Sequence, residues 1–251
     1  MIRAVIFDLD GTLVQTERLK ATSYAQAAHE LCASCNNQEA VVDAFKEVAG
    51  LSRRDVATFL LERFSLEPFA KSRMDEFNVH RPWQAFVQLR LRFYEAMLSN
   101  PALIRSSTWP HAIGLLRHVR ISGFKTGLAT MSHCREASRV LHELGLAGSF
   151  DFIATRDDIE HSKPHPEIYL LVASELRCSP TDCLVIEDSL PGVKAALAAG
   201  MRCLCIPTPF TRNAMLEQTI LDQRWVVEEP SDLMHMFTCM VEERKIEDRK
   251  L

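Results

Sequence analysis

Long hydrophobic runs are missing from this sequence of 251 residues. No stretch of about 18 apolar residues occurs, so the sequence predicts no membrane-spanning helix. An export signal is missing as well, because the first apolar segment, residues 1–7, already has the character of a buried strand. We therefore expect a cytoplasmic protein that does not bind membranes.

The sequence also lacks an excess of positive charge. It contains 29 lysine and arginine residues against 33 aspartate and glutamate residues, which gives a formal net charge of −4. A slightly acidic protein has no general attraction for nucleic acid or anionic membranes, so neither is expected as a partner. The sequence says nothing about oligomeric state, and a monomer is the default expectation.

The eight cysteines lack the spacing of a metal-binding set. Cys32 and Cys35 form one C-x-x-C pair, a spacing found in zinc and redox sites, but no second such pair accompanies it. Without an export signal, free thiols are the default state of cysteine. We therefore expect Cys32 and Cys35 to be free thiols near the end of a helix.

Strand-like and helix-like patterns are unevenly distributed along the chain. Residues 4–9 are a short apolar run typical of a buried strand, whereas residues 16–99 show helical periodicity without strand-like alternation. From Trp109 onward the two patterns alternate, which predicts an α/β fold with a parallel sheet and helices on both faces. We expect a Rossmann-like core of residues 1–15 and 100–251, with residues 16–99 inserted as an all-helical cap domain.

The periodicity also predicts individual elements. Further strands are expected at residues 124–130, 152–155, 183–186, 203–206 and 225–227. Helices are expected at residues 17–31, 43–48, 54–64, 83–98, 111–121, 135–144, 166–176 and 193–199. The highly charged residues 242–250 are expected to be a helix end or a frayed tail.

Polar side chains follow the ends of several predicted strands. Ligands of an open parallel sheet bind beyond the carboxyl ends of its strands, so these side chains are expected to converge. Carboxylates crowded in this way repel one another unless a cation neutralises them, and Mg²⁺ prefers carboxylate and phosphate oxygens. The residues concerned are Asp8, Asp10, Thr130, Met131, Ser132, Lys163, Glu187 and Asp188.

Four short motifs among these residues resemble those of the haloacid dehalogenase-like superfamily, in the family's order. The resemblance covers the whole predicted core, and the helical segment falls where that family carries its helical cap. It implies a Rossmann-like fold and phosphoryl-transfer chemistry. The motifs are F-D-L-D-G-T-L at residues 7–13, Thr130, Lys163 in S-K-P, and Glu187 with Asp188 in E-D-S.

The resemblance implies a role for each motif residue. Asp8 is implied to be the nucleophile that forms an aspartyl-phosphate. Asp10 is implied to protonate the leaving alcohol and then to deprotonate the attacking water. Thr130 and Lys163 complete the implied catalytic set. The implied Mg²⁺ ligands are Asp8, Asp10, Glu187 and Asp188, and the implied phosphate contacts are Thr130, Met131 and Lys163.

Several features narrow the reaction. Dehalogenation needs the nucleophile alone, so the further acidic residues would be surplus. Thr12 is the residue usual in the family's phosphatases, and Lys20 stands where its mutases carry a histidine that protects the phosphoenzyme from water. The sequence therefore favours a Mg²⁺-dependent phosphatase that hydrolyses a small phosphorylated metabolite of the sugar phosphate type. A β-phosphoglucomutase-like sugar phosphomutase is the alternative, and a catalytically silent binding domain on the same fold is the second.

The helical segment carries candidate substrate contacts. Residues 50–55 resemble a cap loop of the β-phosphoglucomutase-like branch, which implies that Arg53 grips the distal phosphate of the substrate. Further candidates for a positive contact with the substrate are Lys20 and either Arg90 or Arg92.

Overall fold

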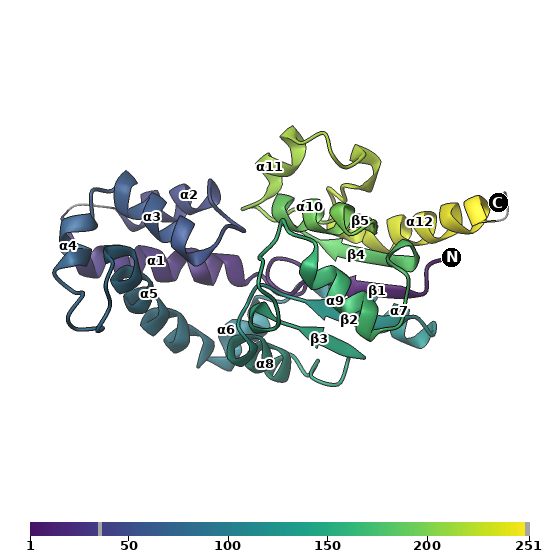
Figure 1. Cartoon of the computed structure of the whole chain (residues 1–251), viewed down its shortest axis with the longest axis horizontal. Helices are drawn as coiled ribbons and strands as arrows, with labels where there is room; N and C mark the ends of the chain where they lie inside the picture. The colour runs from purple at the N-terminus through teal and green to yellow at the C-terminus, as the bar shows by residue number, and fades with distance from the viewer. Residues whose placement is uncertain (35–36, 249–251) are drawn as a thin grey trace. The chain divides into compact units, whose positions relative to one another are not determined.

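The structure is a computed structural model that describes residues 1–34 and 37–248. It divides into two compact units (Figure 1). The core unit comprises Met1–Gln15 and Ile104–Leu251, and the helical unit comprises Thr16–Leu103. The catalytic and cap roles predicted for these two parts of the chain stay predictions.

The core unit is built on a parallel sheet, as the alternating sequence pattern predicts. Within the described residues the sheet has five strands in the order β3-β2-β1-β4-β5. The central strand β1 is fully buried, which explains its unbroken apolar sequence A-V-I-F. The strands are β1 (Ala4–Phe7), β2 (Lys125–Ala129), β3 (Phe152–Ala154), β4 (Cys183–Glu187) and β5 (Arg202–Cys205).

Helices cover both faces of this sheet, which confirms the predicted fold class. The chain steps from β1 to β2 to β3 in one direction and then from β4 to β5 in the other. Right-handed crossovers therefore place α7 (Pro110–Ile121) and α8 (Cys134–Glu143) on one face, and α9 (Glu167–Glu175) and α10 (Leu190–Ala198) on the other. Helix α12 (Leu233–Asp248) packs against α7.

Local sequence signals account for several helix starts. Pro110 opens α7 at a position where the missing N–H costs nothing. The Ser189 side chain caps α10 by accepting a hydrogen bond from the Gly192 N–H at 3.3 Å. The remaining short elements of this part of the chain are α6 (Pro101–Ser106), η1 (Arg156–Asp158), η2 (Pro180–Asp182), α11 (Arg212–Glu217), η3 (Gln223–Trp225) and η4 (Pro230–Asp232).

The helical unit is held together by contacts of α1 with α2 and α5. Tyr24 on α1 lies at the centre of its core, with ring centroids 5.8 Å from Phe45 and 5.5 Å from Phe86. All three rings are buried. The helices of this unit are α1 (Thr16–Leu31), α2 (Gln38–Lys46), α3 (Arg53–Arg63), α4 (Glu67–Lys71) and α5 (Pro82–Leu98).

The strand predicted at residues 225–227 is wrong. The chain instead forms η3, and Val226 makes an isolated parallel bridge with Cys205. One backbone hydrogen bond, from the Val227 N–H to the Cys205 carbonyl, is too little pairing to define a strand. Three short helices, α4, α6 and α11, were missed because segments of five or six residues carry little periodicity, and residues 233–241 of α12 were missed as well. The charged residues 242–248 are the end of α12, and residues 249 and 250 lie outside the described residues.

The expectation of free thiols is wrong at Cys32, which is disulfide-bonded. Cys35 lies outside the described residues. The expectation rested on the redox state of the assumed compartment, which says nothing about which sulfur atoms lie close together. Free cysteines in the described part of the chain are Cys134, Cys178, Cys183, Cys203, Cys205 and Cys239.

Across the described residues, we find no helix with both the length and the apolar character needed to cross a membrane.

Candidate active site

A buried lysine joins two carboxylates at the carboxyl edge of the sheet. Asp8 directly follows β1, Glu187 ends β4, and Lys163 comes from the loop after β3. The Lys163 ammonium lies 2.7 Å from Asp8 Oδ1 and 2.6 Å from Glu187 Oε1, and it also donates to the Ala129 carbonyl at 3.1 Å. Both carboxylates and the ammonium are almost fully buried.

Glu187 is held by donors on both of its oxygens. Oε1 accepts from Lys163 and from the Tyr169 hydroxyl at 2.9 Å. Oε2 accepts from the Asp188 N–H and from the N–H and hydroxyl of Ser189. These donors fix the orientation of the carboxylate and hence the position of the lysine. A carboxylate offers about four lone-pair sites, so Glu187 has little further acceptor capacity.

Burial and charge shift the pKa values of this cluster. Burial raises the pKa of Asp8 to about 8, against the attraction of Lys163, and the negative charges of Glu187 and Asp10 add to the rise. Burial alone would lower the pKa of Lys163, but Asp8 and Glu187 together keep it above its usual value. The pKa of Glu187 is lowered because Lys163 and the other donors outweigh the effect of burial. The site therefore holds more negative than positive charge.

Asp10 is oriented by two hydroxyl groups from the end of β2. The Ser132 hydroxyl donates to Asp10 Oδ2 at 2.5 Å, and the Thr130 hydroxyl donates to the same oxygen at 3.3 Å. Thr130 in turn accepts the Ser132 N–H at 3.0 Å. Thr130 is fully buried, and its own N–H extends the sheet by donating to Ala154. Met131 lies between them and is partly exposed.

Asp188 lies against the turn that follows Asp10. Gly11 has a φ of +91°, and a Cβ atom placed there would lie 2.4 Å from Asp188 Oδ2. Glycine is therefore required both by the left-handed backbone and by the close approach of the carboxylate. Thr211 donates to the same Asp188 oxygen at 3.4 Å. The structure thus brings Asp8, Asp10, Asp188 and the lysine cluster to one edge of the sheet.

The basic residues predicted as substrate contacts gather around one buried tyrosine of the helical unit. The Arg90 guanidinium lies 5.0 Å from the ring centre of Tyr24 and 4.4 Å from that of Tyr94. Burial raises the pKa of the Tyr24 hydroxyl, while the charges of Arg90, Arg53 and Lys20 act to lower it. These three cations are therefore close enough to act on the same hydroxyl.

Arg90 is unusual because it is 3% exposed and incompletely hydrogen-bonded. Within residues 1–34 and 37–248, its Nε and Nη1 have no hydrogen-bond partner. A buried donor left without an acceptor costs about 1–3 kcal/mol, which a bound anion would recover. Arg92, the other candidate, instead forms surface ion pairs with Glu30 and Glu76.

Four side chains of the site were missed or left without a role at the sequence level. Tyr169, Ser189 and Thr211 each donate to an acidic site residue, and Ser132 holds Asp10. Ser132 carried a signal because it follows a predicted strand, and Ser189 carried one because it belongs to the E-D-S motif. Tyr169 and Thr211 sit on or beside helices, at positions that periodicity does not distinguish from ordinary polar ones.

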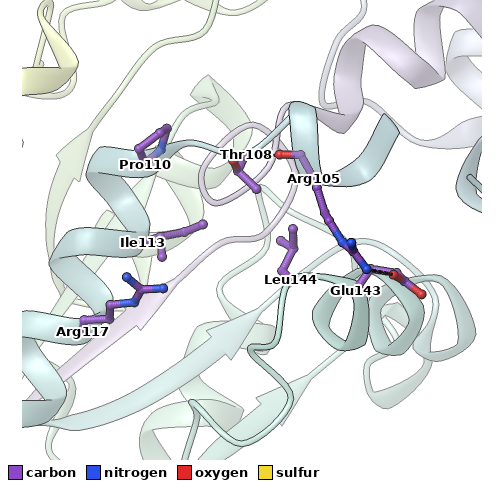
Figure 2. A pocket seen from close by; sticks show the side chains of 7 residues that line it. All are labelled: Arg105, Thr108, Pro110, Ile113, Arg117, Glu143 and Leu144. Atoms are coloured by element: carbon purple, nitrogen blue, oxygen red, sulfur yellow. Dashed lines mark hydrogen bonds and ion pairs between the residues drawn. The ribbon is translucent and has the colours of Figure 1, made fainter. Parts of the chain in front are cut away.

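An open depression elsewhere in the core unit is lined by two arginines and a glutamate (Figure 2). Arg105 and Glu143 form an ion pair across it at 3.4 Å. None of the site residues predicted from the sequence is among its lining residues, so it does not contribute to the candidate site. The lining residues are Arg105, Thr108, Pro110, Ile113, Arg117, Glu143 and Leu144.

Comparison with known proteins identifies the family. Residues 2–200 match the family model described as haloacid dehalogenase-like hydrolase. The chain is 32% identical over 204 residues to the phosphorylated carbohydrates phosphatase of Thermotoga maritima, and this match covers 80% of this chain and 82% of the relative. It is 28% identical over 215 residues to hexitol phosphatase B of Escherichia coli K12, and this match covers 84% of this chain and 86% of the relative.

A solved structure shares the fold. The β-phosphoglucomutase of Clostridium difficile superposes with a TM-score of 0.70 over 96% of this chain and 99% of that chain, at 23% identity. The protein belongs to the haloacid dehalogenase-like hydrolases. The family resemblance and the predicted enzyme class, a phosphoric monoester hydrolase, are thereby confirmed.

Proposed function

We propose that this chain is a Mg²⁺-dependent phosphatase that hydrolyses a small phosphorylated metabolite of the sugar phosphate type through an aspartyl-phosphate on Asp8. The observation that carries the proposal is the buried Lys163 shared by Asp8 and Glu187 at the carboxyl edge of the sheet. The names of two relatives, a phosphorylated carbohydrates phosphatase and a hexitol phosphatase, support the substrate class.

The donor set at this edge fits Mg²⁺. Four acidic residues share this edge with Lys163, so carboxyl groups are in excess, and crowded carboxylates are stabilised by a cation such as Mg²⁺. When bound, Mg²⁺ would neutralise this excess and polarise the transferring phosphoryl group. Glu187 already accepts five hydrogen bonds, so a bond to the ion, or to a water on the ion, would replace one of them. The proposed ligands are Asp8, Asp10, Glu187 and Asp188.

The first half-reaction transfers the phosphoryl group to Asp8. An Asp8 oxygen forms the new bond to phosphorus, the bond from phosphorus to the alcohol oxygen breaks, and Asp10 protonates the departing alcohol. Lys163 offsets the charge on the nucleophile and the phosphoryl oxygens.

The second half-reaction releases inorganic phosphate. Water attacks phosphorus and gives a proton to Asp10, and the bond between phosphorus and Asp8 breaks, so that both aspartates return to their starting states. Thr130 and the backbone at Met131 would hold phosphate oxygens during both steps. Hydrolysis is preferred over phosphomutase chemistry because Lys20 stands where the mutase pattern has a protecting histidine.

We also propose that Arg90, Arg53 and Lys20 bind a second anionic or polar group of the substrate. The buried, unsatisfied donors of Arg90 support this role, because a planar guanidinium with free N–H groups suits a phosphate or carboxylate.

A panel of phosphorylated metabolites, scored by phosphate release, tests the proposed function. We expect Mg²⁺-dependent turnover of one or more sugar phosphates that EDTA abolishes and that Asp8→Asn lowers at least 10³-fold. Asp43→Asn on the exposed surface of α2 is the matched control and should keep wild-type activity. Formation of glucose 6-phosphate from β-glucose 1-phosphate with glucose 1,6-bisphosphate would favour the mutase instead. No turnover of any substrate would favour the silent binding domain.

A further inference from the structure

The loop that carries Lys163 also brings together two histidines and a glutamate outside the candidate active site. His161 and His165 flank the lysine in sequence, and Glu167 opens α9. One potential ligand atom from each of the three lies within 4.8 Å of the other two. His161 Nδ1 is 2.9 Å from Glu167 Oε2, and His165 Nδ1 is 3.7 Å from the same oxygen.

The backbone holds the Glu167 carboxylate in place. The Glu160 N–H donates to Oε1 and the His161 N–H donates to Oε2, both at 2.8 Å. These backbone hydrogen bonds lower the pKa of Glu167 to about 2, so the side chain is an anion at any physiological pH. Two imidazole nitrogens therefore face one oxygen of a carboxylate that the backbone holds fixed.

The arrangement exceeds what a surface ion pair requires. A single histidine beside a glutamate would make such a pair, as His142 does with Glu143 at 3.8 Å. Here a second imidazole lies against the first, with ring centroids 4.6 Å apart, and it also faces the carboxylate. Stacking two potentially cationic rings gains nothing for an ion pair with one carboxylate, whereas both rings are useful as metal ligands.

We propose that His161, His165 and Glu167 form a binding site for a first-row transition-metal ion, with Zn²⁺ as the representative ion. Neutral imidazole and carboxylate suit Zn²⁺, whereas Mg²⁺ prefers oxygen ligands, so this site and the proposed Mg²⁺ site take different ions. Three protein ligands leave a further coordination position for water.

The site needs only small side-chain movements to close around an ion. Zn²⁺ lies about 2.0–2.2 Å from nitrogen and oxygen ligands, so tetrahedral ligands are roughly 3.3–3.5 Å apart. The side chains of His161 and His165 are 61% and 51% exposed and are therefore able to rotate by the required ångström or so. A bound ion would tie together the backbone on both sides of Lys163.

Zinc titration calorimetry, run with excess Mg²⁺ to occupy oxygen-rich sites, tests the proposal on the full-length protein. We expect wild type to bind one more equivalent of Zn²⁺ than the double variant His161→Gln with His165→Gln. His165→Gln alone should weaken this binding about tenfold or more. The control His142→Gln, which alters a lone histidine–glutamate pair, should match wild type.

Thermal unfolding provides the second readout. Zn²⁺ should raise the melting temperature of wild type and of His142→Gln more than that of the double variant, because binding to the folded state stabilises it. All proteins should melt alike in EDTA, which shows that the substitutions leave the fold intact. Equal Zn²⁺ stoichiometry and affinity in wild type and the double variant would overturn the proposal. The outcome does not depend on whether the protein is a phosphatase.

Discussion

Replacing Lys163 with methionine deletes the buried cation that holds two carboxylates together. The side chain is 4% exposed, and its ammonium lies within 2.7 Å of Asp8 and 2.6 Å of Glu187. Removing one partner of a buried ion pair costs about 3–5 kcal/mol because it leaves an uncompensated charge. Since the Glu187 carboxylate would remain buried without its cation, we expect Lys163→Met to lower the free energy of unfolding by about 3–5 kcal/mol. At roughly 2–4 °C per kcal/mol, the melting temperature should fall by about 6–20 °C.

Urea unfolding in EDTA, followed by tryptophan fluorescence, measures this loss. Glu187→Gln combined with Lys163→Met should be more stable than Lys163→Met alone, because the second substitution removes the stranded charge of Glu187. We expect a coupling energy of about 1–3 kcal/mol.

Lys125→Met is the matched control for this cycle. Lys125 donates to a backbone carbonyl, that of Leu176, at 2.6 Å, so its replacement should cost about 0.5–1.5 kcal/mol. A loss below about 1 kcal/mol for Lys163→Met, or strict additivity in the double variant, would refute the buried charge cluster.

Three further predictions concern other parts of the protein. Ser132→Ala should lower kcat/KM for an alkyl phosphate about tenfold more than for p-nitrophenyl phosphate, because Ser132 orients Asp10 and the alkyl leaving group needs the proton of Asp10. Equal losses for the two substrates in steady-state assays would contradict this. Arg90→Leu should raise KM for the preferred sugar phosphate about tenfold and change the free energy of unfolding by less than about 1.5 kcal/mol. A large loss of stability with an unchanged KM would mean that Arg90 has a structural role. In EDTA, wild type should lose stability relative to Asp8→Asn as pH rises from 4 to 8. The folded pKa of Asp8, about 8, lies above the ordinary 3.8, so the stabilisation from its proton is complete below pH 4 and is lost as pH rises to 8. Parallel pH profiles in urea unfolding would show that Asp8 titrates normally.

Much of the fold could be predicted because two of its strands, β1 and β4, are short and nearly continuously apolar. β1 and β4 are buried along their whole length, and buried strands of a parallel sheet leave a clear hydrophobic run in the sequence. The segment at residues 225–227 carries the same kind of run but pairs through one bridge only, because pairing depends on the neighbouring strand and not on composition.

The candidate site could be predicted as far as its residues follow strands. Asp8, Lys163 and Glu187 were expected at one edge, and the structure places them in direct contact. That Glu187 holds the lysine could not be predicted, because five donors from three separate segments meet on this carboxylate. Tyr169 reaches it from α9, and that contact depends on how the helix packs on the sheet.

The burial of Arg90 was also beyond the sequence. Arg90 could be suggested as a substrate contact, but a helical periodicity places arginine on an exposed face by default. Its burial between Tyr24 and Tyr94 follows from the packing of α1 against α5.

Trapping the phosphoenzyme tests the proposed reaction most directly. Asp10→Asn removes the base of the second half-reaction, whereas the p-nitrophenolate released from p-nitrophenyl phosphate in the first half-reaction needs no proton from Asp10. Acid quenching of this variant with ³²P-labelled p-nitrophenyl phosphate and Mg²⁺, followed by peptide mapping, should therefore give near-stoichiometric label on Asp8, and none when Asp8→Asn is added. Label on another residue, or label that survives Asp8→Asn, would contradict the assignment of Asp8 as the nucleophile.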